Sequence, residues 1–277
     1  MPDSGAEPGP DPVADPIAGA RALVTGASSG IGAAVAVALG RAGATVALAA
    51  RRADRLDAVL AEVRTTSSAS QAFVVDLADL DGIPAFAERV ERALGGIDLC
   101  VHAAGIPKRR SLTALSRADL EEVMRVNFEA PVALTGALLP GMLARDRGRV
   151  VTVSSMGAHA AAIRVGAYAA SKAALEAWTE GLHLDLVGTG VDAQCFVPGT
   201  TRTEFSLPRE GNDAPFAPPG GMEPDDVAAA LIAQVRSGVF EAFASEEHAA
   251  TAAAKRRDPN GFLAATAAHL ARRSAED

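Results

Sequence analysis

The sequence predicts an α/β fold in which a doubly wound parallel sheet of about seven strands is covered by helices on both faces. Of the 277 residues, 49% are hydrophobic and 22% are charged, which is enough apolar material for one sizeable core. From Arg21 onward, short apolar or β-branched runs alternate with longer stretches rich in Ala and Leu, as βαβ units do. Gly43, Gly95, Gly148 and Gly190 stand just before successive strands, where a helix end needs a residue that tolerates positive φ.

The elements follow from this alternation in chain order. The short apolar runs expected to form strands are 22–25, 45–49, 72–75, 99–102, 149–154, 192–196 and 240–244. The longer stretches expected to form helices are 31–42, 53–64, 83–94, 117–144, 165–186 and 224–237. The C-terminal stretch 246–277 also has helical spacing. It is expected to close the substrate pocket of its own or a neighbouring subunit, or to pack outside.

Two segments depart from the alternation. Residues 1–17 combine four acidic residues with five prolines, so we expect a disordered acidic tail before a single domain over 18–277. Residues 201–221 carry four prolines and are too long for an ordinary connector, so we expect a lid over a binding site.

Charge and cysteine usage narrow the class of protein. The net charge is −8 and no basic stripe with interleaved aromatics occurs, which disfavours a nucleic-acid partner. No apolar run reaches the length of about 20 residues that a membrane span needs, and the acidic N-terminus is unlike a signal peptide. Cys100 and Cys195 lack metal-ligand spacing, so we expect no metal site and two buried free thiols. These features favour a cytoplasmic protein without a membrane partner.

A glycine-rich turn links the first strand to the first helix. Such a turn places backbone N–H groups and a helix N-terminus where a pyrophosphate can bind, as in a Rossmann fold. The candidate cofactor residues in it are Gly26, Ser28, Ser29, Gly30, Ile31 and Gly32. The spacing Gly-x-x-x-Gly-x-Gly differs from the more familiar Gly-x-Gly-x-x-Gly, and glycine turns also serve plain helix packing.

The end of the second strand predicts which nicotinamide cofactor binds. An acidic residue there would bond the ribose 2′-hydroxyl of NAD, whereas this chain has Arg51 and Arg52. A guanidinium suits a 2′-phosphate, so NADP(H) is preferred and NAD(H) stays possible. The alternative is that both arginines are solvated charges at a helix start. After the third strand, Asp76 and Leu77 could bind the adenine, or Asp76 could cap the following turn.

The chain has nine phenylalanines but a single tyrosine, Tyr168, and Lys172 follows it by one helical turn. A cation beside a phenol favours the phenolate, so Lys172 is expected to lower the pKa of Tyr168 and prepare it for proton transfer. Ser155 ends the fifth strand and can hydrogen-bond the substrate oxygen. The three residues therefore predict general acid–base chemistry on an oxygen atom.

These motifs together resemble the short-chain dehydrogenase/reductase family in its single-domain form, over about residues 21–244. The resemblance implies that Ser155 orients the substrate, Tyr168 is the general acid/base, Lys172 is its partner, and Asn127 holds a water joining the lysine to solvent. Further cofactor contacts implied by position are Ala103, Ala104, Gly105, Val126, Tyr168, Lys172, Pro198, Gly199, Thr201 and Thr203. One departure is His102-Ala103 where the family usually has two asparagines, so an amide that ties neighbouring strands is absent.

The function that these residues predict is NADP(H)-dependent interconversion of a ketone or aldehyde and an alcohol. One alternative is the same site acting on an imine or an activated alkene in place of the carbonyl. The alternative from another class of protein is a cofactor-binding sensor or scaffold without catalysis. Phe205 and other apolar residues of the expected lid favour a hydrophobic substrate. His159 is expected in the substrate pocket or on a surface loop. By resemblance, the helices at 117–144 and 165–186 are expected to pair into a homodimer or homotetramer.

Overall fold

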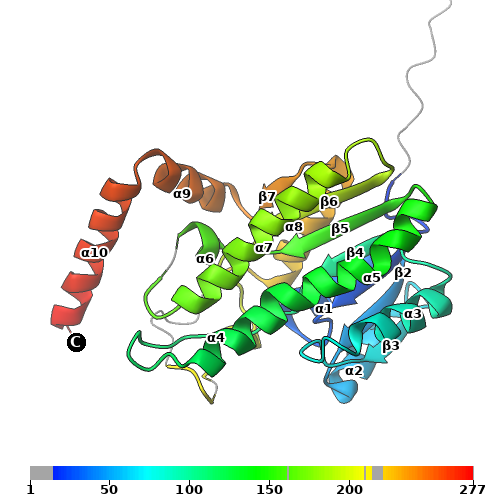
Figure 1. Cartoon of the computed structure of the whole chain (residues 1–277), viewed down its shortest axis with the longest axis horizontal. Coiled ribbons are helices and arrows are strands. Elements are labelled where there is room, and N and C mark those ends of the chain that lie inside the picture. The colour runs from blue at the N-terminus through cyan, green and yellow to red at the C-terminus, as the bar shows by residue number, and fades with distance from the viewer. Residues whose placement is uncertain (1–14, 161, 209, 214–220, 277) are drawn as a thin grey trace, which may run out of the picture.

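The computed structural model, which describes residues 15–160, 162–208, 210–213 and 221–276, contains a seven-stranded parallel sheet (Figure 1). The strand order is β3-β2-β1-β4-β5-β6-β7. The strands are β1 (Arg21–Thr25), β2 (Thr45–Ala50), β3 (Gln71–Val74), β4 (Leu99–His102), β5 (Gly148–Val153), β6 (Val191–Val197) and β7 (Glu241–Phe243). The predicted fold class is confirmed. Because β2 and β4 flank β1, the winding direction reverses there, and such a reversal opens a crevice at the carboxyl ends of the strands.

Helices cover both faces of this sheet. The helices are α1 (Gly30–Arg41), α2 (Ala53–Val63), α3 (Ile83–Leu94), α4 (Arg117–Met124), α5 (Ala130–Ala144), α6 (Met156–His159), α7 (Gly166–Asp185), α8 (Pro224–Ser237), α9 (Glu246–Arg257) and α10 (Pro259–Glu276), with a π turn η1 (Arg125–Glu129) and a 3₁₀ turn η2 (Glu204–Ser206). Helices α1, α2 and α8 share one apolar cluster with the sheet, and α3 and α5 share the other. The two clusters make a three-layer domain.

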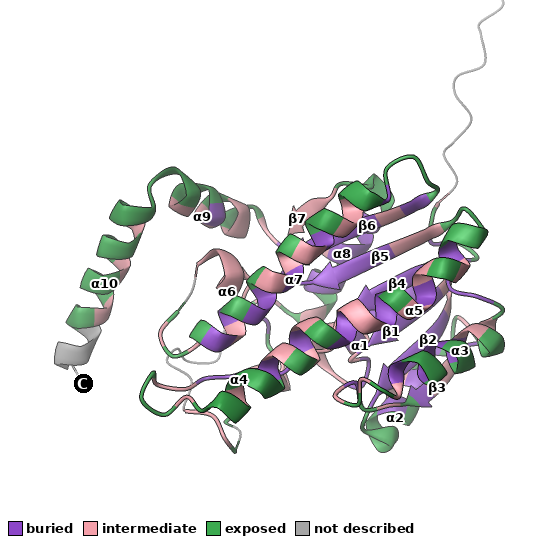
Figure 2. Ribbon diagram, in the orientation of Figure 1, coloured by how far each residue is buried: buried purple, intermediate pink, exposed green. Residues whose placement is uncertain are grey.

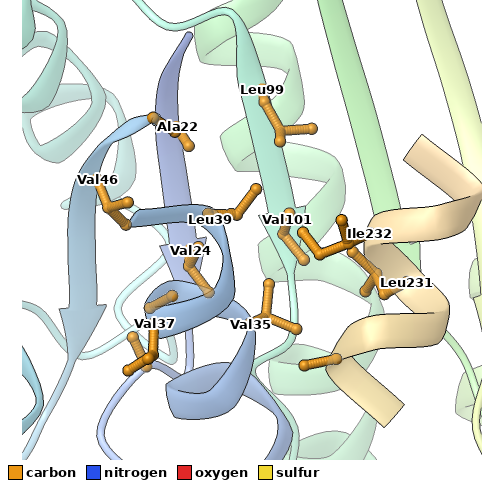
Figure 3. Packing of buried hydrophobic residues seen from close by; sticks show 14 of the residues in the cluster. Ala22, Val24, Val35, Val37, Leu39, Val46, Leu99, Val101, Leu231 and Ile232 are labelled. Carbon is orange, nitrogen blue, oxygen red and sulfur yellow. The ribbon is translucent and has the colours of Figure 1, made fainter. Parts of the chain in front are cut away.

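The layer between α1, α8 and the sheet is built from small and branched side chains. Figure 3 shows Val35 and Leu39 of α1 beside Leu231 and Ile232 of α8, over Val24 and other strand residues. The central strands are buried along most of their length (Figure 2), as a parallel sheet covered on both faces requires. Cys100 and Cys195 are buried free thiols, as predicted.

Two expected helices are divided in the structure. The stretch 117–144 is α4 and α5 joined by the π turn η1, whose extra residue buries the side chain of Asn127. The stretch 246–276 is divided into α9 and α10, because Pro259 lacks an N–H and Asp258 before it has non-helical backbone angles, φ −140° and ψ 81°. Helix α10 projects from the body beyond α9 and is exposed along most of its length (Figures 1 and 2).

The N-terminal boundary of the domain lies earlier than predicted. Ile17 is fully buried in the α1–α8 cluster, and Asp15 accepts hydrogen bonds from Arg236 of α8, one of them at 2.7 Å. Residues 15–17 therefore belong to the folded domain, and the remainder of the expected tail lies outside the described residues.

One stretch is long and apolar enough to cross a membrane, contrary to the sequence prediction. Within residues 117–144, one 18-residue window reaches a mean hydropathy of 1.2, which the apolar residues of α5 supply. A single such stretch is weak evidence for a span, since a core helix of a soluble protein passes the same test. Here Leu134, Leu138 and Met142 of α5 are buried against the sheet.

Candidate active site

A cavity of about 550 Å³ opens at the carboxyl ends of β1, β2, β4, β5 and β6. It brings together, from segments far apart in the sequence, every predicted site residue except Asn127. They are Gly26, Ser28, Ser29, Gly30, Ile31, Gly32, Arg51, Arg52, Asp76, Leu77, Ala103, Ala104, Gly105, Val126, Ser155, Tyr168, Lys172, Pro198, Gly199, Thr201 and Thr203. The roles of these residues stay predictions.

The glycine turn is shaped for close approach of backbone atoms. Gly26 has φ +69°, and a Cβ on it would lie 2.7 Å from the Cα of Ala104. A Cβ on Gly32, in the first turn of α1, would collide with the carbonyl oxygen of Gly26. Side chains are excluded from these positions, so the N-terminus of α1 is left open toward the cavity and can bind an anion.

Arg52 lies over the glycine turn. Its guanidinium donates hydrogen bonds to the hydroxyls of Ser29 at 2.8 Å and Ser28 at 3.3 Å, and to the Glu204 carboxylate at 2.8 Å. Arg51 also lines the cavity and is exposed. The end of β2 thus presents two cations beside the place where a pyrophosphate would bind, and this cradle fits the phosphates of a dinucleotide.

Asp76 caps the turn that follows it, which was the alternative to adenine binding in the sequence prediction. Its Oδ1 accepts a hydrogen bond from the backbone N–H of Ala78 at 3.0 Å. The residue still lines the cavity together with Leu77, so capping the turn leaves it beside the predicted adenine position.

Ser155, Tyr168 and Lys172 meet at the other end of the cavity. Ser155 caps α6 by accepting a hydrogen bond from Gly157 N–H at 3.0 Å. A Cβ on Gly157 would lie 3.3 Å from the Ser155 Oγ and 3.4 Å from the Tyr168 ring, so the glycine leaves room between the two side chains. Lys172, one turn further along α7, donates to the carbonyl oxygen of Val153 at 2.8 Å.

The expected lowering of the Tyr168 pKa is not found. Burial raises the pKa of Tyr168 to about 12, opposed by a hydrogen bond with Ser155. Burial also lowers the pKa of Lys172 to about 8, opposed by electrostatic interaction with Cys195 and Glu176. Desolvation penalises the charged form of each group, and at Tyr168 it outweighs the Ser155 hydrogen bond that favours the phenolate.

Asn127 lies behind the cavity wall. Its side-chain amide donates to Ile106 O at 3.1 Å and to the Ser171 hydroxyl at 3.0 Å, and its Oδ1 accepts from Ile106 N–H at 2.8 Å. A Cβ on Gly105 would lie 3.3 Å from the Asn127 Oδ1 and 3.5 Å from the Lys172 Nζ. The amide therefore fixes the loop after β4 next to the lysine.

His102 is a structural residue. It is buried, its Nε2 lies 2.8 Å from the Thr135 hydroxyl, and burial lowers its pKa to about 3. Next to it, the loop after β4 is joined to β1 by Thr25, whose hydroxyl accepts a hydrogen bond from Ala104 N–H at 3.1 Å.

His159 lies neither in the cavity nor on a surface loop. It ends α6, its side chain is buried, and its Nε2 is 3.1 Å from the Glu176 carboxylate while Arg256 of α9 approaches its Nδ1 at 3.3 Å. Helix α9 also reaches the site through His248, whose ring lies directly against Gly199. The C-terminal segment therefore packs on the wall of its own active site through α9.

Arg109 was not predicted as a site residue, because in the sequence it is only a charged residue in a loop. Arg109 is 9% exposed, and its guanidinium donates to the carbonyl oxygens of Leu207 at 3.0 Å, Asp213 at 3.2 Å and Phe205 at 3.4 Å. Its backbone N–H donates to the Asn212 side chain at 2.6 Å. Arg109 thus attaches the described part of the expected lid, residues 201–208, 210–213 and 221, to the loop after β4.

Two further residues beside Arg52 were not predicted: Glu204, which pairs with Arg52, and Arg55, which pairs with the same carboxylate. Glu204 of η2 and Arg55 of α2 are recognisable only by their charge in the sequence. Among the described residues, no group of three or more His, Cys, Asp or Glu side chains could hold a metal ion.

Comparisons with known proteins place this chain in a family of oxidoreductases. The family described as short chain dehydrogenase matches residues 20–212. A short chain dehydrogenase of Pseudocercospora fijiensis is 39% identical over 193 residues, which are 69% of this chain and 62% of that protein. An uncharacterized oxidoreductase of Mycobacterium bovis is 38% identical over 64% of this chain, and the match covers 53% of its length. The matches thus span less than two thirds of these relatives.

Solved structures agree with this placement. A short-chain dehydrogenase from Sphingobium yanoikuyae in complex with NADPH superimposes with a TM-score of 0.75 and 28% identity, covering 88% of this chain and 95% of that one. The chain described here belongs to the short-chain dehydrogenase/reductase family, which the sequence motifs had predicted.

Proposed function

We propose that this protein is an NADP(H)-dependent oxidoreductase that interconverts a ketone or aldehyde and an alcohol. The observation that carries the proposal is the convergence of Ser155, Tyr168 and Lys172 in one cavity with a glycine turn and the Arg51–Arg52 pair. A bound nicotinamide would supply the hydride, and the chain's own residues would supply orientation and the proton.

The Ser155 hydroxyl orients the substrate oxygen and the Tyr168 phenol gives or takes its proton. Because burial raises the pKa of Tyr168 to about 12, the phenol is protonated at neutral pH and is set up as a proton donor for reduction. Lys172 lies one helical turn after Tyr168 and has a pKa of about 8. The lysine is therefore mostly protonated at neutral pH, yet its ammonium can release a proton to a neighbouring group. Asn127 keeps the backbone beside the lysine in place.

The preference for NADP(H) is supported by Arg51 and Arg52 at the end of β2, where the cavity wall contains no carboxylate of that strand. A guanidinium held by two serine hydroxyls is already oriented for a phosphate. A metagenomic short-chain oxidoreductase solved in complex with NADP is 31% identical to this chain, with a TM-score of 0.70 and coverage of 82% of this chain and 97% of that one.

Substitution of the one tyrosine tests this function. NADPH oxidation is followed with a panel of hydrophobic ketones for the parent protein and for Tyr168→Phe. General acid catalysis contributes about 10²–10⁴-fold, so we expect the variant to lose at least a hundredfold in kcat while it still binds NADPH. An unchanged rate contradicts the assignment of Tyr168. Tight NADPH binding without turnover on any carbonyl, imine or activated alkene would favour a sensor instead.

We also propose a homodimer or homotetramer assembled through α4, α5 and α7. Each of these helices presents an exposed leucine, namely Leu120 at 42%, Leu143 at 41% and Leu184 at 63% exposure. Apolar side chains gathered on helix surfaces are common at subunit interfaces. Light scattering that gave the mass of a monomer would contradict this proposal.

A further inference from the structure

The Glu204 carboxylate binds Arg52, one of the two arginines that we propose for cofactor recognition, and also Arg55 of α2. Its Oε2 accepts a hydrogen bond from Arg52 at 2.8 Å, and its Oε1 lies 3.1 Å from the guanidinium of Arg55. Hydrogen bonding from Arg52 and the charge of both arginines lower the pKa of Glu204, so the group is anionic at neutral pH. One carboxylate thus bridges two guanidinium groups at the start of α2.

The same short turn reaches the catalytic end of the cavity. Phe205, next to Glu204, packs on the ring of Tyr168 with 5.5 Å between centroids and 58° between planes. On the other side of Glu204, Thr203 lies against the glycine turn, since a Cβ on Gly30 would be 2.9 Å from the Thr203 Cγ2. The Phe205 N–H donates to the Thr203 hydroxyl at 3.3 Å, which holds the turn together.

We propose that Glu204 is a specificity residue that competes with the 2′-phosphate of NADP(H) for Arg52 and Arg55, and that its displacement loosens the turn holding Phe205 on Tyr168. The inference rests on the proposed NADP(H) dependence. A phosphate has up to two negative charges and three acceptor oxygens, and it pairs with guanidinium groups in bidentate fashion. The Glu204 side chain is 38% exposed, and an ion pair with such exposure is easily exchanged.

The competition affects only ligands with a 2′-phosphate. A 2′-hydroxyl is uncharged and leaves the carboxylate on its two arginines. Each exposed ion pair contributes a factor of about two to five to an equilibrium constant. Glu204→Gln weakens two such ion pairs, those with Arg52 and Arg55. We therefore expect the variant to bind a 2′-phosphorylated ligand roughly fivefold more tightly than the parent does.

The binding test uses 2′,5′-ADP and 5′-ADP, which differ in the 2′-phosphate and contain no nicotinamide. Titration calorimetry compares the parent, Glu204→Gln and the control Glu223→Gln. Glu223 forms an equally short exposed ion pair with Arg202, at 2.8 Å. Its substitution also removes one negative charge, but at a place where neither Arg52 nor Arg55 is its partner. We expect only Glu204→Gln to bind 2′,5′-ADP more tightly, with 5′-ADP unchanged. Equal effects of both substitutions, or weaker binding by Glu204→Gln, would overturn the proposal.

Hydrogen exchange tests the link to Phe205. In the parent, amide exchange over residues 203–207 should be faster with 2′,5′-ADP bound than with 5′-ADP bound. Glu204→Gln without any ligand should already exchange these amides faster than the ligand-free parent. No difference between the two ligands would overturn the link. If the parent binds 2′,5′-ADP no better than 5′-ADP, the proposed NADP(H) preference itself fails. If the parent prefers 2′,5′-ADP and Glu204→Gln does not strengthen that preference, only the role of Glu204 fails.

Discussion

The buried Lys172 is expected to destabilise the folded protein at neutral pH. Burial lowers its pKa from 10.5 to about 8, and its ammonium has one hydrogen bond, to the carbonyl oxygen of Val153. Between these two values the unfolded chain holds a proton that the folded chain has released. The free energy of unfolding therefore rises with pH across this window.

The magnitude follows from the two pKa values. At pH 7 the lysine costs the folded state about 3 kcal/mol, and at pH 9.5 the cost falls to about 1.4 kcal/mol. Lys172→Met removes the cost together with one hydrogen bond worth about 1 kcal/mol. We expect the variant to be about 2 kcal/mol more stable than the parent at pH 7, and this advantage to fall by about 2 kcal/mol by pH 9.5.

Urea unfolding of the cofactor-free protein at pH 7, 8, 9 and 9.5 measures this difference. Tyr168 and the cysteines titrate in parent and variant alike, so their contributions largely cancel in the difference. Lys255→Met, on the outer helix α9, is the control and should give a difference that does not change with pH. A constant difference for Lys172→Met, or a less stable variant at pH 7, would refute the reasoning from burial.

Three further substitutions test packing, two beside the cavity and one at the N-terminal boundary of the domain. Arg109→Ala leaves the carbonyl of Phe205 and its neighbours without their donor, so we expect a loss of about 2–4 kcal/mol in urea unfolding and faster amide exchange in the lid. Gly32→Ala forces a methyl group into the carbonyl of Gly26, so NADPH affinity measured by fluorescence should fall at least tenfold, whereas Gly181→Ala on open helix surface should leave it unchanged. Ile17→Ala should cost about 2–5 kcal/mol, and a cost near zero would place residue 17 in a tail after all.

The sequence predicted well wherever the information was local. The parallel sheet follows from the alternation of apolar runs and helices, and the glycine turn is seven consecutive residues whose conformational freedom is visible in their type. Tyr168 and Lys172 lie one turn apart on α7, so their proximity needs only helical geometry. The sequence did not predict helix boundaries that depend on a single residue. Pro259, which separates α9 from α10, is an example.

The errors concern quantities that depend on the whole fold. The Tyr168 pKa was predicted to fall because the neighbouring charge is visible in the sequence, while the burial that raises it comes from other segments, among them η2. Ile17 looked like part of a proline-rich tail because the cluster that buries it is formed by elements far along the chain.

The sequence by itself determined the fold class, the anion-binding turn and the identity of the catalytic candidates, because each depends on residue type and short spacing. Only the tertiary structure decided how these parts are controlled. Glu204 meets Arg52 across 152 residues of chain, and Arg109 reaches the lid from a loop about a hundred residues earlier. Such contacts depend on how close two groups lie in the folded chain, because burial and ion pairing are set by distances in space. The spacing of residues along the sequence does not give those distances.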